Sequence, residues 1–503
     1  MPPSIFRRLT RRATFVLACA ALIACGGGSA LTPQGVQRPA GNADLANPPE
    51  VTSDGGVARL TLTAAIDPST GGPGLRYNGA FAAPTIRVAP GDTIDVTYVN
   101  DLPSSTKEPL DMANLHFHGL TVSPNAPGDD AITTTAMPGQ TLHYRVRIPA
   151  TQPPGLYWYH SHAHGESNWQ TFNGMSGAIV LNGVASFEPQ TGGLPERIVV
   201  LRNALAHPSY AATLPHARRP SAACARTFGI PGEYTTVNGE PVPVNIAMTP
   251  ERRQFWRVAN ASADGYYDLS IDGATLVLVS TDGVPNTAYP GGIEQRVHHV
   301  VVPPAGRIEF IVDGARAGAA FRTACFYAGP LGGANPAQVL GTMTNAAPAV
   351  PFVPAPGPTP ASYGTYEKPI GTAYAQQRTV FFSENPAGTV FYLNGKSYHP
   401  NDKPMFVARA GTVERWTLYN FTQEAHAFHI HQVHFIQQDV NGKKQPQVWW
   451  DTINLPAALP RGKPSIVHVL VDFRDPIVRG TFLFHCHILQ HEDLGMMAKI
   501  AVR

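Results

Sequence analysis

The sequence predicts an all-β fold made of three β-sandwich domains, and two observations support this prediction. Glycine and proline are both abundant, at 47 and 48 residues, yet no repeat or low-complexity tract accompanies them. That mixture is typical of many short strands joined by tight turns. Apolar and polar side chains alternate at residues 58–63, 85–88 and 93–99, which indicates half-buried strands. Long amphipathic helical patterns are scarce.

A short strand pattern recurs along the chain and indicates how the domains are organised. Residues 90–94 (PGDTI) are echoed by 410–413 (AGTV), and residues 257–260 (RVAN) are echoed by 417–420 (TLYN). The 503 residues are enough for about three domains of ordinary size. We therefore expect domains at residues 56–190, 191–350 and 370–503, with the Pro-rich stretch 351–369 as a linker.

The first 25 residues have the pattern of an export signal. Four arginines precede a mostly apolar run at residues 13–24, which is too short to span a membrane as a mature helix. The run ends in Leu-Ile-Ala-Cys-Gly, which resembles the lipobox of bacterial lipoproteins. In that interpretation Cys25 carries the lipid anchor, residues 26–55 form a flexible tether, and the protein is periplasmic or anchored to the outer membrane. The alternative is ordinary cleavage after Ala30.

Charge and cysteine content narrow the possibilities further. The net charge is +2 with 14% charged residues, so nothing indicates a nucleic-acid partner, and membrane contact is expected only through the lipid. In an exported protein Cys224 and Cys325 can form a disulfide. Two separate buried thiols are an equally good interpretation of these residues.

Histidines gather in four short clusters, two in the first expected domain and two in the last. On a strand, residues i and i+2 face the same side, so each His-x-His pair presents two imidazoles to one point. One such pair is a weak signal, but four pairs supply eight nitrogen ligands suited to copper, zinc or iron. The pairs are His116 and His118, His160 and His162, His429 and His431, and His485 and His487.

The cysteine between His485 and His487 indicates which metal is bound. His485 and His487 face one way on a strand, so Cys486 must face the other. A thiolate with two imidazoles and a weak thioether is the ligand set of a blue-copper electron-transfer site. The expected set is His426, Cys486, His491 and Met496. The two metal sites would then lie on opposite faces of one strand, on the order of 10 Å apart.

These four clusters resemble the copper signatures of the multicopper oxidases, which include laccases, cuprous oxidases, bilirubin oxidases and spore-coat oxidases. The resemblance covers most of the mature chain and implies cupredoxin-like Greek-key domains, a middle domain without copper, and four copper ions. The ten-residue spacing from Cys486 to Met496 is its most specific part. Ala427 stands where the family usually has proline, a residue that is not a ligand.

The resemblance also implies a role for each candidate ligand. The type 1 copper takes the blue-copper set named above, and the type 2 copper takes His116 and His429. The two type 3 coppers take His118, His160 and His487 on one ion, and His162, His431 and His485 on the other. Glu492 and Asp129 match proton-relay acids of the family, although Asp130 adjoins Asp129. His164 and His434 are interpreted as histidines beside the ligands or on the surface, and His143 as an ordinary strand residue.

The implied reaction joins four one-electron oxidations of a donor to the reduction of dioxygen to water. A laccase-like oxidase of phenols or aromatic amines is our first expectation for the donor. A metal-ion oxidase acting on Cu(I), Fe(II) or Mn(II) is the alternative, with Glu424, Asp439, Glu492 and Asp493 as candidate oxygen ligands. The nine methionines do not cluster as a Cu(I)-binding insert would require. A non-enzymatic exported copper-binding protein is a third possibility.

Overall fold

The computed structural model describes residues 41–67, 74–104, 111–205, 224–230, 232–248, 253–346, 357, 360, 362–371 and 373–503. These residues form mainly antiparallel and mixed β-sheets, which confirms the predicted all-β class. The three runs of alternating side chains form β2, β4 and β5. Among the described residues, no helix is both long and apolar enough to cross a membrane.

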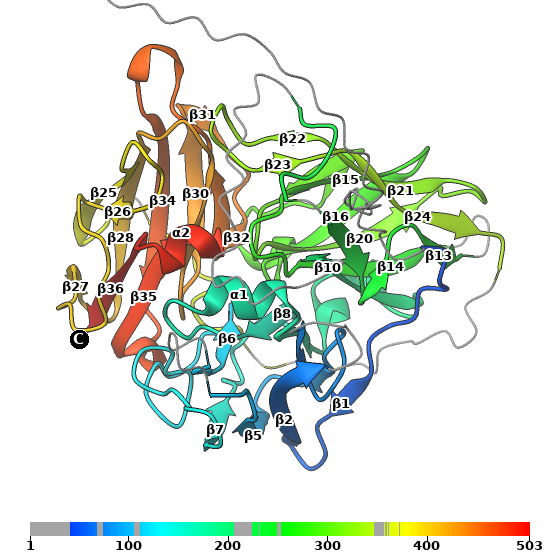
Figure 1. Ribbon diagram of the computed structural model, residues 1–503, viewed down its shortest axis with the longest axis horizontal. Helices are drawn as coiled ribbons and strands as arrows, with labels where there is room; N and C mark the ends of the chain where they lie inside the picture. The colour runs from blue at the N-terminus through cyan, green and yellow to red at the C-terminus, as the bar shows by residue number, and fades with distance from the viewer. Residues whose placement is uncertain are drawn as a thin grey trace, which may run out of the picture. The chain divides into compact units, whose positions relative to one another are not determined.

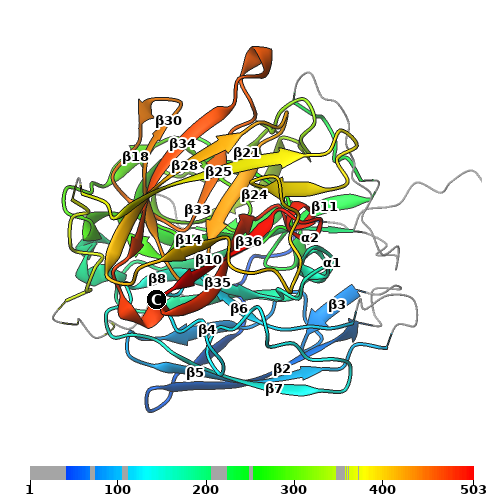
Figure 2. The ribbon, with the colours of Figure 1, turned by 90° about the vertical axis from the view of Figure 1, so that its left-hand side faces the viewer.

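The first segment packs two sheets around one apolar core (Figure 2). One sheet has the order β3 (Gly74–Tyr77), β2 (Val57–Asp67), β5 (Thr93–Asn100) and β7 (Thr141–Arg147). The other has the order β1 (Glu50–Thr52), β4 (Thr85–Val88), β9 (Ser176–Leu181), β8 (Gly155–His160) and β6 (His116–His118). The helix α1 (Ser167–Phe172) and two 3₁₀ turns, Val184–Ser186 and Pro189–Thr191, complete the segment.

The middle segment repeats this arrangement around a second core. Its larger sheet has the order β12 (Glu240–Pro241), β11 (Glu233–Val237), β10 (Glu196–Leu205), β14 (Gln254–Asn260), β20 (Arg307–Asp313), β16 (Thr275–Thr281) and β17 (Val284–Pro285), with β18 (Gln295–Val297) beside β16. The facing sheet has the order β13 (Val244–Ala247), β24 (Gln338–Thr344), β21 (Ala320–Ala324), β15 (Tyr267–Ile271) and β19 (His299–Val302). β22 (Phe326–Tyr327) pairs with β23 (Ala334–Asn335), and Asn286–Ala288 forms a 3₁₀ turn.

The last segment has a third core and again two sheets. One has the order β26 (Phe391–Leu393), β25 (Gln376–Glu384), β28 (Thr412–Asn420), β34 (Ser465–Phe473), β30 (Phe435–Val440) and β31 (Lys443–Lys444), with β32 (Trp449–Trp450) beside β30. The other has the order β27 (Phe406–Ala408), β36 (Met497–Val502), β35 (Gly480–Cys486), β29 (His426–Ile430) and β33 (Thr452–Leu455). The helix α2 (Leu489–Asp493) and two 3₁₀ turns, Pro460–Gly462 and Pro476–Val478, complete it.

One strand occupies the same place in all three segments. β5, β14 and β28 each pair in parallel with an earlier strand of the same segment (β2, β10 and β25) and antiparallel with a later one (β7, β20 and β34). Each ends in an asparagine, Asn100, Asn260 or Asn420, whose side-chain oxygen accepts the backbone N–H two residues later. The pattern echoed in the sequence therefore corresponds to a repeated structural position.

Two stretches expected to lack regular structure differ in outcome. Residues 26–55 are predicted to be a tether, yet the chain is attached to the sheets well before residue 55. Leu45 is buried, and β1 pairs in parallel with β4, so backbone hydrogen bonds hold this part in place. Most of the expected linker at 351–369 lies outside the described residues, as do the export signal and Cys25.

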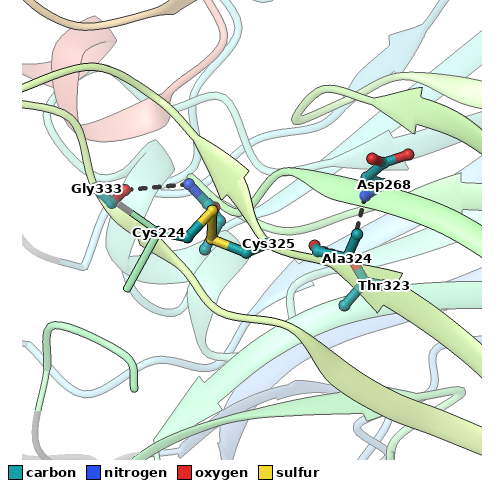
Figure 3. Close-up of a disulfide and its surroundings, with 7 residues drawn as sticks. Cys224, Asp268, Thr323, Ala324, Cys325 and Gly333 are labelled. Atoms are coloured by element: carbon teal, nitrogen blue, oxygen red, sulfur yellow. Dashed lines mark hydrogen bonds between the residues drawn. A yellow bond between two sulfur atoms is a disulfide. The ribbon is translucent and has the colours of Figure 1, made fainter. Parts of the chain in front are cut away.

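The structure also decides the pairing of the two cysteines of the middle segment. Cys224 and Cys325 form a disulfide, with their Cα atoms 5.7 Å apart and a sequence separation of 101 positions (Figure 3). It joins the segment 224–230 to the end of β21. The third described cysteine, Cys486, is buried and free.

Candidate metal centre

The four His-x-His pairs meet where the first and last segments face each other. β6 carries both histidines of the first pair, whereas the other three pairs lie at the ends of β8, β29 and β35, with the second histidine just beyond the strand. β6 and β35 lie side by side in both views (Figure 1 and Figure 2). Strand pairing sets two of the neighbours directly, because His116 lies opposite His160 and His429 lies opposite His485. All eight side chains are at most 1% exposed.

Imidazoles from the two segments interleave within this cluster. His116 stacks on His431, and His118 stacks on His429, with ring centroids 3.8 Å apart in both pairs. The ring centroid of His487 lies 5.0 Å from that of His118 and 5.2 Å from that of His160. The ring centroid of His162 lies 4.8 Å from that of His431 and 5.1 Å from that of His485. The cluster is therefore complete only when the first and last segments are docked.

The nitrogen atoms of this cluster fit a cation better than they fit one another. Nε2 of His116, His118, His160 and His429, and both ring nitrogens of His487, are buried without a hydrogen-bond partner among the described residues. Nε2 of His485 lies 3.3 Å from Nε2 of His162 and 3.2 Å from Nε2 of His431. Burying unpaired polar atoms costs about 1–3 kcal/mol each. Metal ions facing these lone pairs would remove that cost.

Contacts on the other ring nitrogens hold several of these imidazoles in place. Nδ1 of His160 lies 2.8 Å from the Ser161 carbonyl oxygen, and Nδ1 of His429 lies 2.8 Å from the carbonyl oxygen of Asp451. Nδ1 of His485 lies 3.1 Å from the Cys486 carbonyl oxygen. Such contacts set the tautomer and the ring orientation of a metal-binding histidine, leaving Nε2 for the metal.

Burial also keeps six of these imidazoles in the uncharged form that binds metals. Desolvation lowers the pKa of His162 to about 3 and that of His429 to about 4. It lowers the pKa values of four further members well below the usual range, namely those of His118, His160, His431 and His487. Neutral imidazoles offer a lone pair at neutral pH, as metal binding requires.

A second cluster lies on the other face of β35, around Cys486. The Cys486 Sγ atom lies 3.5 Å from Nδ1 of His426 and 3.7 Å from Nδ1 of His491, and the two nitrogens are 3.0 Å apart. The Nε2 atom of His426 is held by the Thr422 hydroxyl at 2.8 Å, so its Nδ1 faces the sulfur. Burial raises the pKa of the Cys486 thiol, so its thiolate needs a cation beside it.

The two methionines that follow His491 in the sequence pack in different apolar clusters. Met496 is fully buried and belongs to the same apolar cluster as Cys486. Met497 begins β36 and packs instead against Tyr398 and Leu483. This placement agrees with the expected axial position of Met496, a role that stays a prediction.

The comparisons with known proteins give the family. Three models described as multicopper oxidase match residues 61–186, 206–330 and 368–503. The chain belongs to the multicopper oxidase family. It is an oxidase that uses copper, dioxygen and a reducing substrate, and its fold is that of the cupredoxin domains.

Individual relatives of this multicopper oxidase are distant but cover nearly its whole length. A laccase of Bacillus subtilis is 24% identical over 477 residues, covering 84% of this chain and 88% of the laccase. A multicopper oxidase of Staphylococcus aureus is 22% identical over 444 residues, covering 85% of this chain and 83% of the relative. The structure of a Campylobacter jejuni multicopper oxidase, described as a metallo-oxidase, matches with a TM-score of 0.72 at 22% identity, over 93% of this chain and 96% of its own.

The two acids expected to move protons both contact the histidine cluster. Glu492 Oε2 lies 3.0 Å from His485 Nδ1, and Oε1 lies 3.6 Å from His162 Nε2. Burial opposes ionisation of Glu492, but these two imidazoles outweigh it and lower the pKa of its carboxyl group. Asp129 Oδ2 lies 2.9 Å from His116 Nδ1 and accepts a hydrogen bond from Gln432 Nε2 at 2.6 Å.

The other acid and the three other histidines considered in the sequence lie in different surroundings. Asp130, the alternative to Asp129, accepts hydrogen bonds from the backbone N–H groups of residues 132 and 133. His434 is buried, and its Nε2 lies 3.6 Å from Asp451 Oδ2, so it sits behind the cluster. His164 packs on Tyr398, with ring centroids 4.9 Å apart, and His143 is an exposed residue of β7.

Sequence reasoning missed most of the residues that line a cleft beside His491. It is lined by Phe228, Glu233, Asp264, Tyr266, Glu424 and His491, from the middle and last segments. Of the four acids proposed as oxygen ligands, Glu424 alone is among the residues that line it. Glu492 faces the histidine cluster, Asp493 accepts the backbone N–H groups of Gly165 and Asn168, and Asp439 lies 3.0 Å from His468. No short motif marks Glu233 or Asp264 in the sequence.

Sequence reasoning also missed a buried ion pair between Arg307 and Asp451. Arg307 Nη1 donates to Asp451 Oδ1 at 2.8 Å, and Nη2 donates to Oδ2. Burial disfavours both charges, but the partners outweigh it, so the pKa of Asp451 is lowered and that of Arg307 is raised. Because 144 residues separate them, only the fold could bring them together.

Proposed function

We propose that this oxidase holds four copper ions and oxidises small phenols or aromatic amines, one electron at a time, while reducing dioxygen to water. The observation that carries the proposal is the pairing of two buried ligand clusters, one around Cys486 and one of eight imidazoles, with a cleft beside His491. The proposed ligand sets are those that the family resemblance implies.

Copper ions bound at these sites would accept electrons singly and supply four of them to dioxygen, which takes up four protons to give two waters. The protein's own residues divide the remaining work. His491 lines the cleft and stands 3.7 Å from the Cys486 sulfur, so it connects the donor to the buried thiolate. Cys486 is covalently joined to His485 and His487, which makes β35 the short path between the clusters.

Proton supply falls to Glu492 and Asp129. Glu492 is fully buried, and its two oxygens face two imidazoles from different segments, so it can pass a proton on at the edge of the cluster. Asp129 orients His116, and its bond to the side chain of Gln432 leaves it less free to exchange protons. We assign the main relay to Glu492.

The cleft favours an aromatic donor that can donate a hydrogen bond. Phe228 and Tyr266 provide aromatic surface, while Glu233, Asp264 and Glu424 provide acceptors for a phenol O–H or an amine N–H. Asn203 donates to both Glu233 and Asp264, at 3.0 and 2.6 Å, which holds the two carboxyl groups together. Relatives named laccases, including that of Bacillus subtilis, support this choice.

A metal-ion donor is the second candidate because the same three carboxyl groups could bind a divalent cation. Oxygen consumption by the copper-loaded protein tests both, with a phenol, an aromatic amine, Cu(I), Fe(II) and Mn(II) offered separately. We expect the highest kcat/KM with the phenol or the amine. Faster turnover of a metal ion than of the phenol or the amine would favour the alternative. The alternative would be established if Glu233→Gln then slowed oxidation of the metal ion and left oxidation of the phenol unchanged. Oxygen uptake with none of the five donors would contradict the proposal.

We also propose that the protein is exported and lipidated at Cys25. The Leu-Ile-Ala-Cys-Gly sequence supports this, and the Cys224–Cys325 disulfide suits an oxidising compartment. Mass spectrometry of the protein from its native membrane fraction should find a diacylated cysteine at the amino terminus. An unmodified terminus at Leu31 would indicate ordinary secretion instead.

A further inference from the structure

Two charged residues of the middle segment reach the histidine cluster, although this segment contributes none of the proposed ligands. Arg307 begins β20, and Asp282 lies in the turn after β16; the two residues are 1% and 0% exposed. The Asp282 Oδ1 atom accepts the backbone N–H of Arg307 at 2.9 Å. The guanidinium group of Arg307 donates hydrogen bonds to both carboxylate oxygens of Asp451 in the last segment.

Asp282 also hydrogen-bonds to the backbone at Asp451. Its Oδ2 atom accepts the backbone N–H groups of Asp451 and Thr452, both at 3.0 Å. The Thr452 hydroxyl donates to Asp451 Oδ1 at 2.7 Å. The middle segment therefore fixes both the main chain and the side chain of Asp451, where β32 leads into β33.

Asp451 in turn contacts two proposed ligands. Its carbonyl oxygen lies 2.8 Å from Nδ1 of His429, and its Oδ1 lies 3.6 Å from the same nitrogen. Oδ1 also lies 3.8 Å from Nδ1 of His118, which is 3.2 Å from Arg307 Nη1. The rings of His118 and His429 are stacked, so one carboxylate lies against the outer nitrogens of both.

We propose that Arg307 and Asp282 are positioning residues of the copper centre, which orient His118 and His429 through Asp451. This inference rests on the proposed histidine ligand set. A planar guanidinium can hold both oxygens of a carboxylate in one geometry, which the ammonium group of lysine cannot do. Loss of such outer contacts typically weakens metal binding about 10–100-fold.

The test compares Arg307→Lys with Arg257→Lys. Arg257, on the neighbouring strand β14, is equally buried and is also paired with two carboxylates, those of Glu196 and Glu309. No contact between Arg257 and a proposed ligand is found in the described residues. Each copper-free variant is titrated with copper and followed by two signals, the electron paramagnetic resonance of type 2 copper and the blue absorption at Cys486.

We expect Arg307→Lys to bind the type 2 copper about 10–100-fold more weakly, with altered hyperfine splitting and unchanged blue absorption. Arg257→Lys should keep both signals. Equal losses in the two variants would mean that the middle segment acts only through general stability, and an unchanged titration of Arg307→Lys would also overturn the inference.

Asp282→Asn provides the second variant if Arg307→Lys does not fold. Its amide keeps the bond to the Arg307 backbone but presents one acceptor fewer to Asp451 and Thr452, so we expect the same weakened type 2 signal. An unchanged signal would overturn the inference. A wild-type protein that binds the blue copper and no other would instead contradict the proposed ligand set, so the two failures are distinguishable.

Discussion

At the scale of single residues, Glu492 and Met496 occupy positions whose surroundings suggest separate roles. Glu492 is an acid enclosed with two imidazoles, and Met496 is a thioether packed beside a buried thiol. Neither interacts with bulk water, because both are fully buried. Each should therefore affect one step of the reaction, and a conservative substitution should separate that step from the others.

Glu492→Gln should slow the reduction of dioxygen more than it slows electron uptake from the donor. The amide keeps the size of the side chain but cannot cycle a proton, and general acid–base help is typically worth about 10²–10⁴-fold. Rapid mixing of the reduced variant with dioxygen measures this step. Asp439→Asn, whose acid contacts His468 instead of the cluster, is the control. Reoxidation at the wild-type rate would remove Glu492 from the relay.

Met496→Leu should raise the reduction potential of the blue site and leave the copper content unchanged. A thioether donates weakly to copper and favours the oxidised ion, so its loss favours the reduced ion. Redox titration measures the potential. Met497→Leu is the matched control, because Met497 packs against Tyr398 and Leu483. The reduction potential of the blue site in this variant should equal that of the wild type. A shift in the control alone would place the axial ligand one residue later.

At the scale of elements, β35 joins the two clusters. His485 and Cys486 are adjacent on it and point to opposite faces, and β35 pairs with β29, which carries His426 and His429. Helix α2 follows at once and supplies His491 and Glu492. Figure 1 shows α2 beside α1, where Asp493 accepts the backbone N–H groups of Gly165 and Asn168.

Cys486→Ser should abolish donor oxidation and the blue colour while leaving three coppers per chain. The substitution removes the strongest ligand of one cluster and touches none of the eight imidazoles on the other side. Metal analysis, visible absorption and oxygen uptake check these outcomes together. Turnover near the wild-type rate would contradict the proposed electron path through Cys486.

At the scale of the whole molecule, the two clusters differ in how many segments must dock to form them. All four proposed ligands of the blue site come from the last segment, whereas the histidine cluster needs both the first and the last. Arg307 and Asp282 of the middle segment complete its surroundings. Copper bound in the histidine cluster should therefore hold the segments together.

Removing all copper should lower the midpoint of thermal unfolding, because ions that bind only the folded state stabilise it by mass action, about 2.7 kcal/mol at 100 times the dissociation constant. The copper-loaded Cys486→Ser variant should keep most of the difference, since its histidine cluster remains filled. Calorimetry of the three forms makes the comparison. Equal midpoints for the loaded and copper-free wild type would contradict it.

The sequence by itself determined the fold class, the family and the proposed ligands. Strand alternation is a local property, so the spacing of His485, Cys486 and His487 is enough to place their side chains on two faces. The repeated pattern ending in Asn260 and Asn420 likewise reports a local strand and turn. The same locality left the pairing of Cys224 with Cys325 open, because it depends on how distant strands pack.

Only the tertiary structure decided which imidazoles face one another, where the cleft beside His491 opens and which residues lie behind the histidine cluster. His118 stacks on His429, and Arg307 of the middle segment forms an ion pair with Asp451 of the last segment, although neither pair is close in sequence. Glu233 and Glu424 line one cleft for the same reason. Contacts of this kind arise when separately formed sheets bury their faces against each other, and docking of that kind leaves no periodic trace in the sequence.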